Sequence, residues 1–511
     1  MAGGGFPNAY AVTAPYDVAV LGLGPAGLCA ALRLRQMGRS VVVLERARAI
    51  QGSVGELLTP GVRGILEFLG LPDALIHARG QDVLSNRVIW SERHLVSSRP
   101  SPREAGIMVD RALFDGHLAH AALNSGADVL RGCCVESMDC HPSGWCISFS
   151  TNGRRQALTA RFIVDARGRA GSAHARMSLA PRLLALRTEF PRHVGPCEVS
   201  IEALPDGWLW GAPTCQGSYR VLAFCDPVAM RGLRLSQSFS HPSSWLQRML
   251  AHSRLFSHLP TVEATSLRAY DATPYLHRDW WGENIVKVGD AALALDPLSS
   301  SGVEKGMRFA LQAVLAINTL LSSGRTEPLA KEFLQGKMHE SCGRHLAWTQ
   351  HQYGQTWCVR QNPFWQARAA ERPLEGLPEG DALRIINCRA LAWAALEPKQ
   401  TRPTRDSWPI NPLQLLDAPA LACDVEIANV ACAVGDLIEL KPAVIHPNLS
   451  TPVVFVHGRE LVPLLREIGP SRSYADLLER WSTRVTAPEA ISICAWALRN
   501  RLLTSTSRTA G

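Results

Sequence analysis

Residues 16–46 read YDVAVLGLGPAGLCAALRLRQMGRSVVVLER, and this stretch decides the fold of the N-terminal part of the chain. An apolar run at 18–21 meets a glycine-rich turn, and a helical stretch rich in Ala, Leu and Arg follows. A second apolar run at 41–44 then ends in Glu45. An apolar strand, a helix and another apolar strand in this order predict one βαβ unit with parallel strands.

The turn between the first strand and the helix has the glycine spacing GxGxxG. The first glycine permits a tight turn, the second lets the backbone approach a pyrophosphate, and the third lets the helix pack closely on the strand. The helix N-terminus offers free N–H groups to phosphates, and an acid ending the second strand accepts hydrogen bonds from a ribose diol. The unit therefore predicts dinucleotide binding. The residues expected to contact the dinucleotide here are Gly22, Gly24, Pro25, Ala26, Gly27, Glu45 and Arg46.

Length and composition exclude several classes of protein. A chain of 511 residues is larger than one hydrophobic core supports, so two or three domains are expected. It has no run of about 18 apolar residues and no apparent signal peptide, which predicts a cytoplasmic protein without a membrane span. Its 14 cysteines lack metal-ligand spacing, so no metal site is expected.

Three later segments identify the dinucleotide. The stretch NIVKVGDAALALDPLSSSGVEKG (284–306) resembles the second FAD fingerprint of the glutathione-reductase-like flavoproteins. IMVDRALFDGHLAHAAL (107–123) and FIVDARGRAG (162–171) resemble two further elements of that family, in the same chain order. The resemblance implies that FAD is the cofactor and that Asp290 binds its ribityl chain. It also implies an α/β fold with a Rossmann domain for FAD and an inserted mixed β-sheet substrate domain.

Three short motifs narrow the family. Val54-Gly55-Glu56, WLWGAP (208–213) and LDPLSSSG (295–302) together resemble the tryptophan-halogenase-like branch of flavin monooxygenases. The stretch 350–368, which ends in NPFWQAR, also resembles this branch. The resemblance implies that the first and third motifs lie beside the flavin. The further residues expected to bind FAD on this basis are Glu56, Arg111, Asp165, Gly289, Asp290, Pro297, Ser301, Gly302 and Val303.

Two departures from the halogenases bear on the chemistry. Halogenases of this branch use a lysine in the N-terminal third, whereas the first of only six lysines here is Lys287. They also use a glutamate at the position of Ser299. The resemblance without these groups implies a flavin that, once reduced by NAD(P)H or a separate reductase, reacts with O₂ to give a C4a-hydroperoxide. Such an intermediate hydroxylates electron-rich rings.

Four residues are the candidates for the reaction side. Trp208 and Trp210 alternate on an expected strand, so they point to one face and are expected to separate the flavin from a substrate pocket. Two tryptophans that simply fill the core of a sheet fit the same pattern equally well. Asp296 and Ser299 border the expected flavin turn, where Asp296 is a candidate acid or base.

The expected domain organisation follows these motifs. Prolines and other helix breakers between 372 and 417 predict a linker or wrapping segment, and a small α+β unit of winged-helix-like order is expected after it. The expected ranges are an FAD-dependent core at 1–370 (FAD-binding segments about 14–80, 105–175 and 280–330; substrate-domain segments about 80–105 and 175–280), a linker at 371–419 and a C-terminal domain at 420–511.

The charge of the C-terminal part argues against a nucleic-acid partner. The whole chain has a net charge of +8, but the residues from Pro373 onward include 14 Lys or Arg and 15 Asp or Glu. A module that reads DNA is basic, so a protein or peptide dock is the better interpretation of this unit, with plain structural packing as an alternative.

A flavin core that lacks the halogenase groups and carries such a unit resembles the flavoproteins that mature tryptophylquinone cofactors, the LodB-like and QhpG-like group. That resemblance implies hydroxylation, once or twice, of a specific tryptophan in a partner polypeptide, the small subunit of quinohemoprotein amine dehydrogenase. A small-molecule aromatic hydroxylase, a halogenase and a prenyl-lipid reductase share the scaffold and remain alternatives. A flavin-binding assembly partner without turnover is the alternative from a different class.

Overall fold

The computed structural model describes residues 15–49, 57–171, 173–191, 195–228, 230, 242–263, 267–323, 327–396, 418–449, 451–469 and 471–506. The chain divides into two compact units. The larger comprises Met1–Leu321 and Lys337–Ala390, and the smaller comprises Ser322–Gly336 and Leu391–Gly511.

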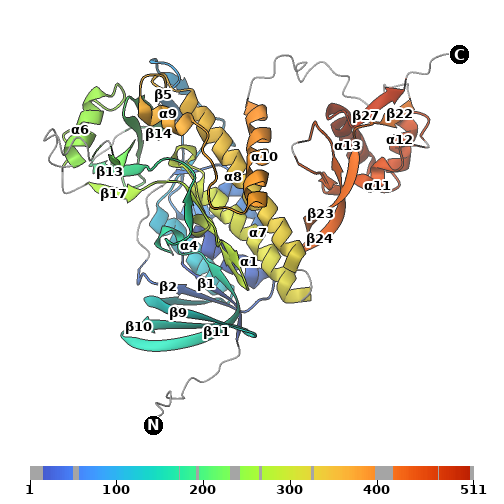
Figure 1. Cartoon of the computed structure of the whole chain (residues 1–511), viewed down its shortest axis with the longest axis horizontal. Coiled ribbons are helices and arrows are strands. Elements are labelled where there is room, and N and C mark those ends of the chain that lie inside the picture. Colours follow the sequence, from blue (N-terminus) through green and yellow to red (C-terminus); the bar gives the residue numbers. More distant parts are fainter. Residues whose placement is uncertain are drawn as a thin grey trace, which may run out of the picture. The chain divides into compact units, whose positions relative to one another are not determined.

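The first sheet of the larger unit confirms the predicted βαβ unit. Strands β1 (Tyr16–Leu21) and β2 (Val41–Glu45) pair in parallel, and helix α1 (Pro25–Gln36) connects them. The sheet order is β19-β20-β11-β1-β2-β8, and β11 continues into an antiparallel extension with β10 and β9 that is marked in Figure 1. The other strands are β8 (Asp128–Arg131), β9 (Cys133–His141), β10 (Gly144–Thr151), β11 (Arg154–Asp165), β19 (Trp281–Gly282) and β20 (Ile285–Lys287).

Apolar β-branched residues explain why this sheet lies inside the molecule. Val41, Val42 and Val43 are buried in β2, as a parallel sheet covered on both faces requires. Helix α4 (Arg111–Asn124) packs against α1, and Asp110 caps its N-terminus by accepting hydrogen bonds from Ala112 N and Leu113 N.

A second, seven-stranded sheet has the order β17-β13-β16-β15-β14-β5-β6. Its central strand β15 is buried at every position. One face packs on α6 (Pro242–His252), and the other face packs on an aromatic cluster that includes Tyr353 and Trp365. The strands are β5 (Ser85–Ile89), β6 (Val96–Ser98), β13 (Leu184–Phe190), β14 (Glu198–Leu204), β15 (Gly207–Pro213), β16 (Tyr219–Cys225) and β17 (Arg268–Asp271).

Four helices follow the flavin-like turn: α7 (Gly302–Ser323), α8 (Glu327–Gly354), α9 (Pro363–Ala369) and α10 (Glu379–Leu396). Helix α10 lies in the segment that was expected to be a linker. It packs tightly on α8, because a Cβ added to Gly343 would lie 2.6 Å from the Cβ of Cys388, and His339 pairs with Asp381 at 3.2 Å. The flanking prolines hid this helix in the sequence, and only Ile385 is buried among its residues.

The smaller unit joins a hairpin of β23 (Glu426–Val434) and β24 (Leu437–Ile445) to three helices. Its outer strands β22 (Ala418–Leu421) and β27 (Leu503–Thr506) pair with each other. The helices α11 (Leu461–Leu465), α12 (Tyr474–Trp481) and α13 (Ala487–Arg499) surround a core in which Trp481 donates a hydrogen bond to Leu464 O at 2.8 Å. Ser473 caps the N-terminus of α12 by accepting a hydrogen bond from Asp476 N.

The remaining short elements of the larger unit support the two sheets. They are α2 (Val62–Phe68), α3 (Ala74–His77), β3 (Leu57–Leu58), β4 (Gln81–Asp82), β7 (Ile107–Met108), β12 (Arg176–Ser178), β18 (Tyr275–His277) and β21 (Leu293–Ala294), with β25 (Phe455–Val456) and β26 (Arg459–Glu460) in the smaller unit.

Candidate active site

The glycine turn after β1 has a distinct geometry at each glycine. Gly22 has a φ of +106°, and an added Cβ would lie 2.5 Å from Ala166 O. A Cβ on Gly27 would lie 2.3 Å from Gly22 O, so this position holds the helix against the strand. A Cβ on Gly24 would meet no atom within 4 Å. The protein therefore needs the first and third glycines for its own packing and leaves space over the second, where a pyrophosphate fits.

Glu45 ends β2 beside this turn. Its carboxylate accepts hydrogen bonds from Leu23 N at 2.8 Å and from Ala47 N at 2.7 Å. These bonds fix the acid at the edge of the glycine turn, where the ribose of a bound dinucleotide is expected. The neighbouring Arg46 is exposed.

The second FAD fingerprint lies against the first. Gly289 has a φ of +59°, and a Cβ there would lie 3.1 Å from the Cβ of Ala26 at the start of α1. Asp290 pairs with Arg169 at 3.3 Å, and its backbone carbonyl accepts a hydrogen bond from the Tyr275 hydroxyl at 2.6 Å. Two motifs that are far apart in the sequence thus meet at one place, which fits a single extended cofactor such as FAD.

Arg111 and Asp165 are both buried and both bound by neighbours. Arg111 forms an ion pair with Asp115 at 3.1 Å. Asp165 pairs with Arg167 at 2.8 Å and with Lys287 at 3.5 Å. Burial alone would raise the pKa of Asp165, but the hydrogen bonds and charges of these partners outweigh burial and lower it. These ion pairs support the nucleotide fold, and the predicted contacts of Arg111 and Asp165 with FAD stay predictions.

The turn at 296–302 connects β21 to α7. Asp296 accepts a hydrogen bond from Leu298 N at 3.0 Å and so caps the short helix at Pro297–Ser299. The Ser299 hydroxyl donates to Asp296 O at 3.1 Å and lies 2.8 Å from the Ser301 hydroxyl. A Cβ on Gly302 would meet no atom within 4 Å. Gly302 and Val303 then begin α7, so the turn leaves room at a helix N-terminus for a ligand.

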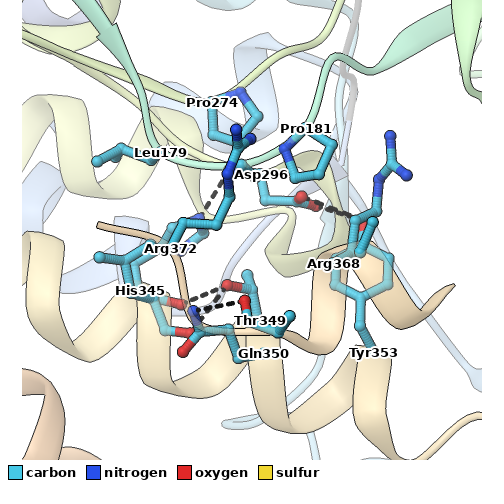
Figure 2. A pocket seen from close by; sticks show the side chains of 14 residues that line it. Leu179, Pro181, Pro274, Asp296, His345, Thr349, Gln350, Tyr353, Arg368 and Arg372 are labelled. Atoms are coloured by element: carbon cyan, nitrogen blue, oxygen red, sulfur yellow. Dashed lines mark hydrogen bonds between the residues drawn. The ribbon is translucent and has the colours of Figure 1, made fainter. Parts of the chain in front are cut away.

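A buried polar cluster lies behind this turn. Figure 2 shows Asp296 and Tyr353 facing one another, and the Tyr353 hydroxyl donates to both carboxylate oxygens at 3.1 Å. The Nε2 of His345 accepts a hydrogen bond from Asp296 N at 2.7 Å. Arg368 donates to Phe364 O at 3.0 Å and to Arg182 O at 2.6 Å. The cluster surrounds a cavity of about 10 Å³, close to the size of one water molecule.

Burial changes the protonation behaviour of this cluster. Burial raises the pKa of Asp296 to about 6, although the bonds from Leu298 N and Tyr353 and the charge of Arg368 oppose the shift. Burial lowers the pKa of His345 to about 3, so this imidazole is neutral and accepts through Nε2. Burial and the nearby Asp296 hold the pKa of Tyr353 well above its usual value. Asp296 is therefore the member of this cluster that exchanges a proton near neutral pH.

A larger cavity of about 450 Å³ borders the same turn through Leu298. Its floor is the face of the second sheet, where Val96, Val88 and Ile201 lie opposite one another on three adjacent strands. Residues directly opposite on neighbouring strands point to the same face, so they form one continuous apolar row. Trp348 of α8 also lines this cavity.

Trp90 and Gln352 fix one wall of the larger cavity. The Trp90 indole donates a hydrogen bond to Gln352 O at 2.8 Å, and its backbone carbonyl accepts one from Trp357 N at 3.0 Å. The wall is therefore tied to α8 and to the segment that follows it. Glu92 and His94 also line the cavity and form an exposed ion pair at 2.9 Å.

The two tryptophans of β15 point to one face, as their alternation predicts, and belong to the same buried cluster. Trp210 lies opposite Ile201, one strand further from the sheet edge than the cavity floor. Trp208 stacks on Phe224 with ring centroids 3.8 Å apart and meets Trp90 edge-on at 6.2 Å. Neither is among the residues that line the larger cavity: Trp210 lies beside Ile201 on the same face of the sheet, and Trp208 packs on Trp90 of the wall. Their predicted catalytic part stays a prediction.

Sequence reasoning missed several residues around the two cavities. Trp90, His345 and Trp348 carry no motif, and Tyr353 lies in the stretch 350–368 but was not singled out there. For the residues of α8, only the four-residue spacing shows which of them share a helix face. The motif residue Glu56, with Val54 and Gly55, lies outside the described residues. Within the described ranges, no cluster of side chains suited to a metal ion is present. None of the described helices is long and apolar enough to cross a bilayer.

Comparisons with known proteins agree with this geometry. Residues 83–383 match the family model of tryptophan halogenase. The chain is 27% identical over 338 residues to a tryptophan 2-halogenase of Chondromyces crocatus, a match covering 62% of this chain and 64% of that enzyme. It is 26% identical over 319 residues to the putative FAD-dependent oxidoreductase LodB of Marinomonas mediterranea, covering 59% of this chain and 84% of LodB.

A solved structure has the same fold along nearly the whole chain. The peptidyl tryptophan dihydroxylase QhpG, described as essential for tryptophylquinone cofactor biogenesis, superposes with a TM-score of 0.68 at 24% identity. The superposition covers 95% of this chain and 99% of that one. The α/β fold with an FAD-binding Rossmann core is thereby shown.

Proposed function

The chain belongs to the tryptophan halogenase family of flavin-dependent enzymes, and we propose that it is an FAD-dependent monooxygenase that hydroxylates a tryptophan side chain in a partner polypeptide. The hydroxylation would occur once or twice and would be a step in tryptophylquinone cofactor biogenesis. The reductant in this proposal is NAD(P)H or a separate flavin reductase, and the oxidant is O₂.

The cavity beside the flavin-like turn is the observation that carries the proposal. Its volume of about 450 Å³ lies within the range of sites for small organic ligands. Its floor is a row of aliphatic side chains, and Trp90 and Trp348 add aromatic surface. Such walls hold a flat, electron-rich ring and exclude water from it. Leu298 joins this cavity to the turn expected along the flavin.

Halogenation is the less supported reaction. The chain has no lysine before Lys287, and this side chain pairs with Asp165 at 3.5 Å. Ser299 takes the position of the halogenase glutamate, and its hydroxyl is bonded within the turn. The resemblance to halogenases therefore extends to the flavin scaffold but not to the two groups expected to deliver an activated halogen.

Bound FAD, once reduced, supplies the activation of O₂, and the residues of this chain supply position and protons. The apolar row orients the ring. Asp296, with a pKa raised to about 6 by burial, accepts a hydrogen bond from the Tyr353 hydroxyl. We place the proton-handling role of the site at Asp296, because burial moves the pKa values of His345 and Tyr353 away from neutrality.

Intact-mass analysis of a tryptophan-bearing partner polypeptide tests the proposal. The polypeptide is incubated with this protein, FAD, a reductant and O₂, and we expect a gain of one or two oxygen atoms that maps to one tryptophan. Gly24→Val is the matched control, because a Cβ at this position meets no protein atom within 4 Å and the side chain fills the space left for the pyrophosphate. This variant should fold, lose FAD and add no oxygen.

Other outcomes would contradict the proposal. Hydroxylation of free indoles but of no polypeptide would establish a small-molecule hydroxylase. Turnover that adds halogen, or that proceeds without O₂, would establish a halogenase or a reductase.

If Asp290→Ala abolished oxygen transfer while partner binding persisted, a purely structural, non-catalytic role would be excluded.

A further inference from the structure

The edge of the second sheet lies directly beside the apolar cavity. Strand β6 (Val96–Ser98) is the last strand of that sheet, and among the described strands it pairs only with β5. All three of its residues are exposed, and Val96 is 54% exposed. A strand in this position presents main-chain N–H and C=O groups that have no strand to pair with on one side.

This edge strand is short, at three residues, but it lacks the other usual protections of an exposed edge. Proteins commonly guard exposed edges with charged side chains, prolines or bulges inside the edge strand. The sequence of β6 is Val-Ser-Ser, without a charge or a proline, and its pairing with β5 is regular over all three residues. The adjacent Leu95 and the more distant Leu84 add exposed aliphatic surface at 40% and 58%. An open edge with these properties suits the addition of another strand.

The edge is continuous with the cavity floor. Val96 lines the cavity and lies opposite Val88, which lies opposite Ile201. A strand added to β6 would lie about 4.8 Å beyond it and would extend this row by one residue. The side chain opposite Val96 would point to the same face, over Val96 and Val88 and into the cavity.

From this juxtaposition we propose that the polypeptide substrate binds as an extended strand along β6, in a register that places its target tryptophan opposite Val96. The inference rests on the proposed function and adds the mode of substrate recognition. Main-chain hydrogen bonds to β6 supply affinity, and the cavity selects the one side chain that enters it. A free indole can enter the cavity without contacting β6, whereas a polypeptide substrate contacts both β6 and the cavity.

A peptide in which single backbone amides are methylated provides the test. Each N-methyl group removes one N–H donor, and in an antiparallel or parallel strand only every second residue directs its N–H toward a given neighbour. With the wild-type protein, we expect methylation to raise the KM of a tryptophan-bearing peptide at least tenfold at alternate positions flanking the tryptophan. The positions between them should change KM by less than twofold.

A proline variant of the protein tests the same contact from the other side. Ser97→Pro removes a backbone donor from β6. This donor either faces the added strand or pairs with β5, and in both cases its loss should raise the peptide KM at least tenfold. Its FAD content and unfolding temperature show whether the fold is kept. Ser137→Pro, on the exposed edge strand β9 of the other sheet, is the matched control and should leave the peptide KM within twofold of wild type.

The outcomes separate this inference from the proposed function. If the wild-type protein adds no oxygen to any peptide, the proposed function fails. If it does add oxygen but the methylation pattern does not alternate and Ser97→Pro keeps the wild-type KM, the inference fails and the function stands. If Ser97→Pro instead converts a dimer to a monomer with unchanged peptide turnover, the edge belongs to a second copy of the chain, and the inference fails as well.

Discussion

Two cavities border the turn at 296–302, and they differ in almost every physical property. The smaller, of about 10 Å³, is closed by Asp296, His345, Tyr353 and Arg368. The larger, of about 450 Å³, has an aliphatic floor and aromatic walls. Helix α8 contributes to both, with residues four apart on one face lining the smaller cavity and residues four apart on another face lining the larger.

The difference shows how one rigid turn serves two purposes. The small cavity places ionisable groups where burial moves their pKa values, and it has no room for a substrate. The large cavity has room for a ring, with an aliphatic floor and with polar side chains, Glu92 and His94, at part of its wall. Asp296 lines the smaller cavity and Leu298 lines the larger one, and the two residues are two positions apart in the same turn. The backbone of this turn therefore fixes the distance between the proton-handling carboxyl group and the wall of the ring-binding cavity.

Filling the larger cavity should have the largest effect on activity. Ile201→Trp places an indole on the cavity floor where the substrate ring would lie, and we expect at least a 100-fold loss of oxygen transfer with FAD content retained. The exposed Ile76→Trp, which adds the same side chain outside the cavity, should retain activity. Steady-state oxygen incorporation measures both, and full activity of the Ile201 variant would mean that this cavity is not the substrate site.

Asp296→Asn should change how stability depends on pH. Because the folded state raises the pKa of Asp296 from 3.8 to about 6, its contribution to stability is fully present below pH 3.8 and is lost as pH rises through 6. The asparagine has no such loss. We therefore expect the variant to gain up to about 3 kcal/mol relative to wild type between about pH 4 and pH 7.5. Urea unfolding at several pH values measures this, with exposed Asp139→Asn as control. A constant difference between variant and wild type would contradict the raised pKa.

Arg368→Met should destabilise the fold by about 2 kcal/mol, because Phe364 O and Arg182 O lose a charged donor in a buried setting. The loss of a positive charge should also raise the pKa of Asp296 further. Arg372 lines the same small cavity but is exposed, so Arg372→Met should change stability by less than about 0.5 kcal/mol. If chemical unfolding showed the same loss of unfolding free energy in the Arg368 and Arg372 variants, the buried hydrogen bonds of Arg368 would contribute nothing to stability.

Tyr353→Phe should have the smallest effect, about 1 kcal/mol of stability, since it removes one hydroxyl and keeps the ring. The lost donor had lowered the pKa of Asp296, so the stability change assigned to that group should move to higher pH in this variant. Repeating the pH series on Tyr353→Phe with and without Asp296→Asn measures the coupling. Additive effects would show that the two side chains do not share a proton.

The sequence predicted the flavin side of the molecule better than the substrate side. The glycines at 22, 24 and 27 have fixed local roles, so their spacing is sufficient to predict the turn and its helix. The GD turn at 289–290 was predictable for the same reason. Both motifs describe backbone geometry within a few residues.

The two cavities depend on contacts between distant segments, which no local pattern contains. The smaller one joins residues near 180, 274, 296, 350 and 368, and the larger one joins β5, β6, β14 and α8. The two tryptophans of β15 were visible in the sequence, but their place beside Ile201 and Trp90 depends on strand register and ring packing. The sequence analysis missed α10, because prolines that flank a helix cannot be told from prolines within a linker by the sequence alone.

The serine pair in the flavin-like turn has a consequence for halogen chemistry at this site. A glutamate restored at position 299 would lack the hydroxyl that donates to Asp296 O and contacts Ser301, so the turn would lose both bonds. It would also meet no lysine from the N-terminal third, because the chain has none there. Halogen chemistry at this site thus requires at least two coordinated changes, a glutamate at position 299 and a lysine in the N-terminal third. A single substitution would therefore not convert this turn to the halogenase arrangement.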